Sequence, residues 1–254
     1  WLRGQDPLDT EWQSWQMPTL SNPFIDPAEL EDARKDLPER VFLQEYMAEF
    51  LEDSEVFRKI TEAAVGRYQR YSNDEFDPEP HHQYVVGVDW GKQKDFSVFS
   101  VIDTTINELC YLDRSNKLDY LVQLDRLSQV FRKFNVTQII AEGNSQATTM
   151  ELLRSTGLPV REFTTTKESK PYIIENLMLA FERADLKIIP DPVLLGELRS
   201  FEATRLPSGY IRYAAPAGYH DDCVMSLALA WDGCKETNMA VTIHGKGKNW
   251  KKRR

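Results

Sequence analysis

An apolar run that ends in an acidic residue constrains this chain more than any other feature. The segment Tyr84–Asp89 reads Tyr-Val-Val-Gly-Val-Asp and is followed by Trp90 and Gly91. A run of this kind, closed by Asp-x-Gly, predicts a buried strand that delivers one carboxylate to the rim of a sheet. Asp89 is therefore the first candidate for chemistry.

Two further acidic sites occur in similar settings. Glu142 ends the apolar run 139–142, and the pair Asp221-Asp222 opens the apolar stretch 223–231. Three separated acids that meet at one sheet edge suggest a site for Mg2+ or Mn2+, because these ions prefer oxygen ligands in octahedral geometry and the chain has only four histidines. Two such ions about 4 Å apart can activate a water and stabilise the leaving oxygen of a phosphodiester.

Each acid also has an ordinary structural explanation. An Asp that follows a strand often belongs to a turn, and Asp221 or Asp222 is well placed to cap the helix after it, where its charge complements the helix dipole. The two roles are compatible, since the tandem pair offers one residue for each. In the metal-site hypothesis Asp89 bridges both metals, Glu142 holds one, and Asp221 or Asp222 completes the set.

Four other side chains are weaker candidates. Asp95 precedes a predicted strand and can be a turn residue, can support the site from outside the ligand set, or can be a further ligand at the sheet edge. His220 can transfer a proton or contact a phosphate, although a single histidine in a turn is more often structural. Lys167 and Lys170 precede a predicted helix at the same rim and can bind the scissile phosphate, although exposed lysines usually have no specific role.

The rest of the chain predicts an α/β fold. After the Asp89 strand, we expect strands over 95–102, 108–112, 137–142, 160–163 and 186–189, and helices over 118–134, 146–155, 172–183, 192–201 and 222–231. The first three strands should form an antiparallel meander, and the helix after them should lead to a parallel partner. Residues 203–213 predict a hairpin that turns at Pro207-Ser208-Gly209 and protrudes beside the acidic site.

Residues 1–75 differ in character, because they are rich in Trp, Pro and charge and have no strand-like runs. Asp26 is expected to cap a helix that begins at Pro27. The acidic run 74–79 reads as a linker into the next domain. Between the helix that Asp26 caps and this linker, a second helix is expected. Its apolar face is formed by Phe42, Tyr46, Phe50 and Leu51.

Composition narrows the classes of protein. A chain of 254 residues with 41% hydrophobic content is long enough for one large core plus an appendage. Its three cysteines have no CxxC spacing, which predicts no disulfide framework and a reducing, intracellular setting. No apolar run approaches the roughly 20 residues that span a bilayer, so a transmembrane role is not expected.

The charge is uneven along the chain. A net charge of −9 argues against a uniformly basic nucleic-acid clamp. The tail 246–254 nevertheless holds six cations in nine residues. It can contact phosphates or an acidic protein surface, or it can be a solvated tail without a partner.

Three segments together resemble the nuclease domain of tailed-phage terminase large subunits. They are residues 87–98 (Gly-Val-Asp-Trp-Gly-Lys-Gln-Lys-Asp-Phe-Ser-Val), residues 140–142 (Ile-Ala-Glu) and residues 220–230 (His-Asp-Asp-Cys-Val-Met-Ser-Leu-Ala-Leu-Ala). Upstream, residues 22–25 and 37–50 are similar to the stretch that joins the packaging ATPase of that family to its nuclease. The resemblance covers most of the chain and leaves the basic tail unplaced.

The resemblance implies an RNase H-like fold, with a central mixed β-sheet flanked by helices and a helical N-terminal extension. It assigns residues 1–75 to the end of the packaging ATPase domain and the linker, 76–240 to the nuclease domain, and 241–254 to the basic tail. It implies a metal-dependent endonuclease that cuts concatemeric double-stranded phage DNA when packaging starts and ends.

By position, the metal-binding acids of the family match Asp89, Glu142 and the Asp221/Asp222 pair, and Lys170 matches a basic residue before the following helix. Many relatives have Asp where this chain has Glu142, which leaves the metal spacing open. The implied cofactor is Mg2+ or Mn2+, with two ions expected.

The implied partners are double-stranded DNA and, in the full motor, the packaging ATPase domain, the small terminase subunit and the portal. The ATPase motifs, including GxxxxGK[ST], are missing from the chain. We therefore expect a fragment without translocation activity, monomeric, in the host cell cytoplasm and away from membranes. Since no segment resembles a base-reading helix, we expect contacts with backbone phosphates and little sequence preference.

Three alternatives share parts of this pattern. Actin-like ATPases and sugar kinases also begin with a strand ending in Asp-x-Gly, but the chain lacks a second Gly-rich phosphate turn and is short for two such domains. Other RNase H-like nucleases, such as Holliday-junction resolvases or transposases, share the acids and are separated only by the upstream similarity. The third alternative is a non-catalytic DNA-holding or capsid-docking module whose acids only cap helices.

Overall fold

The computed structural model describes residues 11, 13–49, 55–65, 77–91, 95–143 and 147–246, with the backbone alone described for 147–150 and 236–246. The chain divides into two compact units, Trp1–Ser54 and Glu55–Arg254. The predicted boundary at residues 75 and 76 therefore lies inside the second unit.

Helix α2 (Pro27–Asp36) of the first unit begins where the sequence predicts. Asp26 caps it, because its carboxylate accepts a hydrogen bond from the Ala28 N–H at 2.9 Å, and Pro27 occupies the first helical position. A 3-10 turn, η1 (Thr19–Ser21), precedes it.

Helix α3 (Glu39–Glu45) carries part of the predicted apolar face. Phe42 is buried and stacks on Tyr46, with ring centroids 5.4 Å apart. Phe50 and Leu51, which were predicted to extend this face, lie outside the described residues.

In the described part of the second unit, a five-stranded mixed sheet forms the centre. Its strands are β1 (Tyr84–Asp89), β2 (Ser97–Asp103), β3 (Glu108–Ser115), β4 (Val136–Glu142) and β5 (Val160–Phe163). They lie in the order β3-β2-β1-β4-β5; β1, β2 and β3 are antiparallel, and β4 runs parallel to both β1 and β5. The predicted meander and the predicted parallel pairing are both confirmed.

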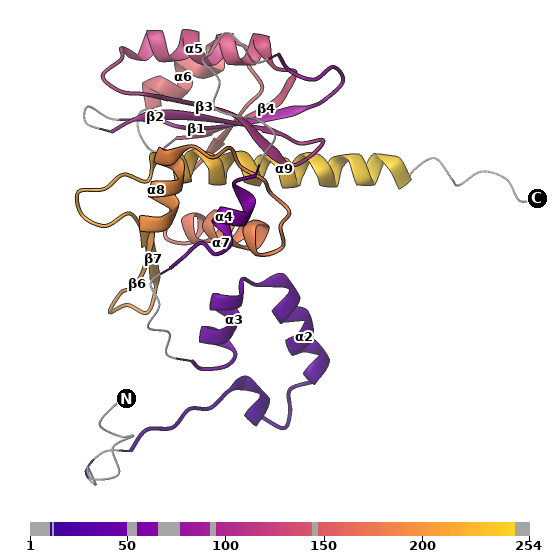
Figure 1. Cartoon of the computed structure of the whole chain (residues 1–254), viewed down its shortest axis with the longest axis vertical. Helices are drawn as coiled ribbons and strands as arrows, with labels where there is room; N and C mark the ends of the chain where they lie inside the picture. Colours follow the sequence, from indigo (N-terminus) through magenta and orange to yellow (C-terminus); the bar gives the residue numbers. More distant parts are fainter. Residues whose placement is uncertain are drawn as a thin grey trace, which may run out of the picture. The chain divides into compact units, whose positions relative to one another are not determined.

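Helices cover both faces of this sheet (Figure 1). On one face lie α5 (Tyr120–Lys133) and α6 (Ala147–Ser155), and on the other lies α9 (Asp222–Lys246), with α4 (Ile60–Ala63), α7 (Ser169–Glu182) and α8 (Pro192–Ser200) beyond it. The antiparallel pair β6 (Glu202–Arg205) and β7 (Ile211–Ala214) forms the predicted hairpin. This architecture confirms the predicted α/β class.

Residues 55–65 contribute side chains to the core of the second unit. Val56, Phe57 and Ile60 belong to the buried core. The Phe57 ring lies 5.8 Å from the ring of Phe181 and 5.5 Å from that of Phe201. The functional assignment of residues 1–75 remains a prediction.

Two element predictions are wrong. Residues 186–189 form no strand, because their backbone makes only one bridge, between Lys187 and Glu108, while their apolar side chains fill the core. Helix α9 runs on to Lys246 and takes up the first part of the segment predicted as a tail. The remainder of that tail, residues 247–254, lies outside the described residues.

Two further features bear on the predictions from composition. No helix in the described ranges has the length and apolar character needed to cross a bilayer. Cys110, Cys223 and Cys234 are free and buried, and burial raises the pKa of each thiol.

Helix α9 contacts β1 at closest range where the strand has a glycine. A Cβ atom on Gly87 would lie 2.0 Å from the Ser226 carbonyl oxygen and 2.4 Å from the Ala230 nitrogen, which is closer than real Cβ contacts come. Further along α9, a Cβ atom on Gly233 would meet the side chain of Val85, earlier in the same strand. The helix therefore runs opposite to β1, and its N-terminus lies at the acidic end of the strand.

This contact predicts a large penalty for Gly87→Ala. Because backbone atoms block the new methyl group, the helix must move away, and we expect the free energy of unfolding to fall by about 3 kcal/mol or more. The matched control is Gly196→Ala in α8, where a Cβ atom would meet nothing within 4 Å and helix propensity favours alanine by about 1 kcal/mol. Urea unfolding followed by circular dichroism measures both, and equal stability of the two variants would contradict the packing argument.

Candidate active site

Two acids meet where the parallel strands β1 and β4 end. In the register of these strands, Val88 is paired with Ala141. The next residues, Asp89 and Glu142, end their strands, and the charge of Glu142 contributes to the raised pKa of Asp89. The two carboxyl groups therefore lie near each other at this edge of the sheet.

Helix α9 brings the third acidic segment to the same edge. Ser226 lies against Gly87, Asp222 is one helical turn before Ser226, and Asp89 is two residues beyond Gly87. One helical turn from Ser226 to Asp222 rises about 5.4 Å, and the two residues from Gly87 to Asp89 span about 6.6 Å of strand. The two acids therefore lie at nearly the same height along the helix and the strand. Asp222 is therefore brought close enough to Asp89 for its charge to raise the pKa of that residue.

Crowding and burial perturb these carboxyl groups. The pKa of Asp89 is raised well above its usual value, first by burial and then by the charges of Glu142, Asp222 and Asp221. Burial also raises the pKa of Asp222 to about 6, although the Phe96 N–H donates a hydrogen bond to Asp222 Oδ2 at 3.3 Å and opposes the shift. Such a site gains stability from any cation that neutralises it.

The donor set suits a hard divalent cation, because it consists of carboxyl groups that three separate elements bring to one edge of the sheet. Within the described ranges, no three His, Cys, Asp or Glu side chains are already arranged as a ligand set. Burial and the neighbouring acidic charges disfavour the ionised form of Asp89, and a bound cation would offset both effects. The chemistry of the residues therefore fits a divalent metal.

The two members of the tandem pair have different surroundings. Asp221 Oδ2 lies 3.1 Å from Lys170 Nζ, whereas Asp222 accepts a hydrogen bond from the Phe96 backbone. The Asp222 side chain is only 11% exposed, against 28% for that of Asp221. Asp222 therefore faces the buried acids, and Asp221 holds the lysine at the rim.

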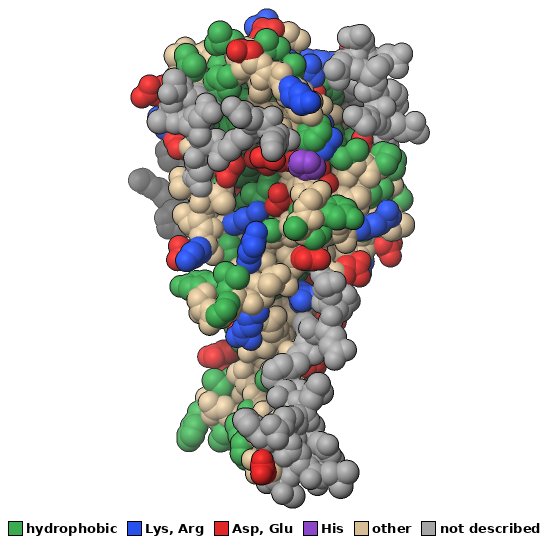
Figure 2. All heavy atoms as spheres, turned by 90° about the vertical axis from the view of Figure 1, so that its left-hand side faces the viewer, with side chains coloured by type: hydrophobic (Ala, Val, Ile, Leu, Met, Phe, Trp, Pro, Cys, Tyr) green, Lys and Arg blue, Asp and Glu red, His purple; other side chains and the backbone are tan. Residues whose placement is uncertain are grey.

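The structure also brings the two weaker candidates His220 and Asp95 to this rim. His220 Nδ1 lies 3.5 Å from Asp222 Oδ2 and 4.0 Å from Asp95 Oδ1, and its ring packs edge-on against Phe96. Figure 2 shows acidic side chains gathered beside a histidine on one face, with lysine or arginine side chains close by. The last weaker candidate, Lys167, lines a pocket at the start of α7.

Glu197 is a further contributor, although no motif marks it. Its carboxylate accepts hydrogen bonds from the N–H groups of Cys223 at 2.7 Å and Val224 at 3.4 Å, so it satisfies donors in the first turn of α9. The capping hypothesis gave this role to the tandem Asp pair. The available sequence signal is an acid on the apolar face of α8, next to the buried Leu194 and Leu198.

Comparisons with known proteins agree with this geometry. No family model matches the chain. The chain is 34% identical over 204 residues to the terminase large subunit of Thermus phage G20c, a match that covers 77% of this chain and 41% of that protein. The chain thus spans less than half the length of this relative.

Solved structures give the same result for the second unit's fold. The large terminase nuclease from thermophilic phage G20c is 29% identical, with a TM-score of 0.66, over 71% of this chain and 98% of that one. The large terminase nuclease domain of Thermus phage P74-26 is 30% identical, with a TM-score of 0.61, over 70% of this chain and 94% of that one. The G20c nuclease also has structures with bound magnesium, cobalt and zinc.

A mixed sheet flanked by helices, with acids at the ends of its parallel strands, defines an RNase H-like α/β fold of the nuclease class. With the similarities above, the chain belongs to the family of phage terminase large subunits and contains their nuclease domain.

The crowded acids predict that Asp89→Asn stabilises the metal-free chain at neutral pH. Since the folded pKa of Asp89 is raised, its contribution to stability is present below the unfolded pKa and is lost as pH rises through the folded value. The variant's advantage in melting temperature should therefore be small near pH 4 and reach about 3 °C or more at pH 7.5.

The control for this measurement is the exposed Asp125→Asn in α5, which should change the melting temperature little at either pH. A lower melting temperature for Asp89→Asn at pH 7.5 in EDTA would show that the acids are not crowded as described.

Proposed function

We propose that this chain is a metal-dependent endonuclease that hydrolyses phosphodiester bonds of double-stranded, concatemeric phage DNA when packaging starts and ends. The observation that carries the proposal is the meeting of Asp89, Glu142 and Asp222 at the end of two parallel strands, beside Lys170. Membership of the terminase family supports the same reaction class.

Asp89, Glu142 and Asp222 would hold Mg2+ or Mn2+, with two ions in the full scheme. A divalent cation at this edge supplies Lewis-acid polarisation of the phosphate and a water that ionises near neutral pH. The metal-bound structures of the G20c nuclease support the use of divalent cations. The choice of Mg2+ or Mn2+ and the number of ions belong to the proposal.

Lys170 positions the scissile phosphate in this scheme. Its ammonium group is 3.1 Å from Asp221, so it is held beside the acids and still carries donors for a phosphate oxygen. His220, whose Nδ1 lies 3.5 Å from Asp222 Oδ2, exchanges a proton with the leaving oxygen in this scheme.

The remaining partners follow from the family alone. In the intact motor we propose contacts with the packaging ATPase domain, the small terminase subunit and the portal, in the host cell cytoplasm. Contact between the basic tail and DNA phosphates stays a prediction, because residues 247–254 lie outside the described ranges.

Plasmid cleavage tests the proposed reaction. Wild-type chain should nick or linearise plasmid with Mg2+ or Mn2+ and leave it intact with EDTA, and Asp89→Ala should abolish cutting because it removes the central ligand. Asp125→Ala, the exposed control, should cut like wild type. Metal affinity and cleavage that survive in Asp89→Ala, or no cutting with any metal, would favour the DNA-holding module instead.

The role of Lys170 is tested by steady-state kinetics. If its charge stabilises the transition state, Lys170→Ala should lower kcat by about 100-fold, as the loss of a positioned donor does elsewhere. Lys187→Ala removes an exposed lysine from the segment before α8 and is the matched control. A change in KM alone would assign Lys170 to DNA binding only.

A further inference from the structure

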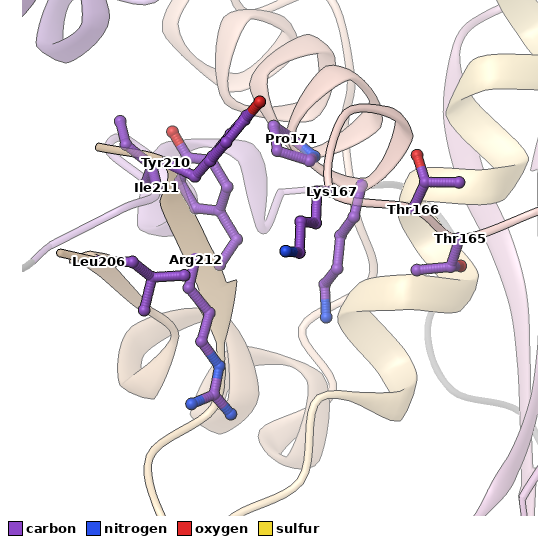
Figure 3. A pocket seen from close by; sticks show the side chains of 10 residues that line it. Thr165, Thr166, Lys167, Pro171, Leu206, Tyr210, Ile211 and Arg212 are labelled. Atoms are coloured by element: carbon purple, nitrogen blue, oxygen red, sulfur yellow. The ribbon is translucent and has the colours of Figure 1, made fainter. Parts of the chain in front are cut away.

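A pocket of about 410 Å³ opens between the start of α7 and the β6–β7 hairpin. Lys167 and Pro171 line it from the α7 side, and Tyr210, Ile211 and Arg212 line it from the hairpin side (Figure 3). Its size falls in the roughly 300–1,000 Å³ range of small-ligand sites.

The pocket adjoins the acidic edge. Lys170 lines the pocket, and its Nζ lies 3.1 Å from Asp221 at the rim of the acids. The hairpin wall is fixed to α7, because the Tyr213 hydroxyl lies 3.2 Å from Glu175 Oε1 and donates to it. Lys170 therefore belongs to both the pocket and the acidic site, and α7 holds both this lysine and the hairpin in place.

The lining combines apolar and aromatic walls with cations and has no acid. Lys167 and Arg212 form no ion pair with any residue in the described ranges, so their charges are available to an anion. Apolar walls add little to the binding of a free phosphate, and three cations add little to the binding of an apolar ligand. The combination fits a flat ring attached to a phosphate.

Three exposed tyrosines line the pocket or lie next to residues of the pocket or the acidic rim in the sequence. Tyr210 on the hairpin is 49% exposed, Tyr172 beside Pro171 is 59% exposed, and Tyr219 beside His220 is 66% exposed. Tyrosines interleaved with cations are the surface on which nucleic-acid bases stack. The chain thus offers stacking groups next to an edge that handles a phosphodiester.

We infer that the pocket takes one unstacked nucleobase of the DNA strand whose backbone crosses the acidic edge. This inference rests on the proposed nuclease function and adds to it that the duplex is opened locally at the cut. The base is held by stacking on Tyr210, and the phosphates beside it are bound by Lys167, Lys170 and Arg212. Because every base has a stacking face, the pocket is tolerant of sequence.

The test compares two duplexes in EDTA, so that no metal chemistry contributes. Both are fluorescently labelled; one has a single unpaired nucleotide at its centre, and the other has an abasic residue there. Fluorescence anisotropy of the whole chain at low salt should give about tenfold tighter binding of the first duplex, as one stacked base predicts. Equal affinity for the two duplexes, or binding of neither, overturns the inference.

Variants test whether a preference for the unpaired base comes from this pocket. Tyr210→Ala should remove the preference for the unpaired base, and Tyr210→Phe, which keeps the ring, should retain it. Arg212→Ala should weaken binding of the base-containing duplex, whereas Arg205→Ala, the same charge loss on the same hairpin outside the pocket, should weaken it less. A preference that persists in Tyr210→Ala, with unchanged circular dichroism, places the base elsewhere and overturns the inference.

Plasmid cleavage by the same preparations separates the two claims. Cutting by a wild-type chain that shows no base preference refutes the pocket and leaves the nuclease intact. A base preference without metal-dependent cutting supports the pocket and refutes the nuclease.

Discussion

The approach of α9 to β1 at Gly87 is the contact on which the site depends. With no side chain at Gly87, the Ser226 hydroxyl can donate to the Gly87 carbonyl at 2.9 Å and lie 2.9 Å from the hydroxyl of Ser100. This buried bond fixes the helix along the strand. One turn back, Asp222 is brought to Asp89, so the spacing of the acids follows from a glycine and a serine that carry no chemistry themselves.

The same contact has an electrostatic cost. Asp89 is buried among other acids, and its raised pKa shows that the folded chain holds this carboxylate against its preference for water. Partial compensation comes from the Phe96 N–H, which donates to Asp222, and from the Lys170 ammonium group beside Asp221. The site is thus stable enough to form and still favours a cation, which is the usual compromise at a functional centre.

The elements that depend on local sequence patterns were predicted correctly. The strand that ends at Asp89, the helix cap at Asp26 and the hairpin turning near Gly209 all follow from periodicity and turn chemistry, and the structure confirms them. Features that depend on distant partners could not be predicted in this way. Residues 186–189 have the composition of a strand, but their backbone makes only one bridge, between Lys187 and Glu108. Phe57 packs against Phe181 and Phe201, which are far from it in the sequence.

In the candidate site, too, local sequence patterns could be read in advance and contacts between distant residues could not. The sequence predicts where Asp89, Glu142 and the tandem pair lie, because apolar runs next to acids mark sheet edges and helix starts, while their role as ligands remains a prediction. It does not separate Asp221 from Asp222, since only the folded chain shows that Lys170 faces one and Phe96 the other. Nor does it mark Glu197, whose bonds to the first turn of α9 join residues far apart in the sequence.

The central claim is that β1, β4 and the start of α9 assemble one divalent-cation site. Anomalous diffraction from crystals of this chain soaked in Mn2+ tests it most directly, because it locates the metal without relying on activity. A manganese peak bound by Asp89 together with Glu142 or Asp222 is the predicted result. Crystals that bind manganese only elsewhere, or show no peak beside Asp89, would contradict the account.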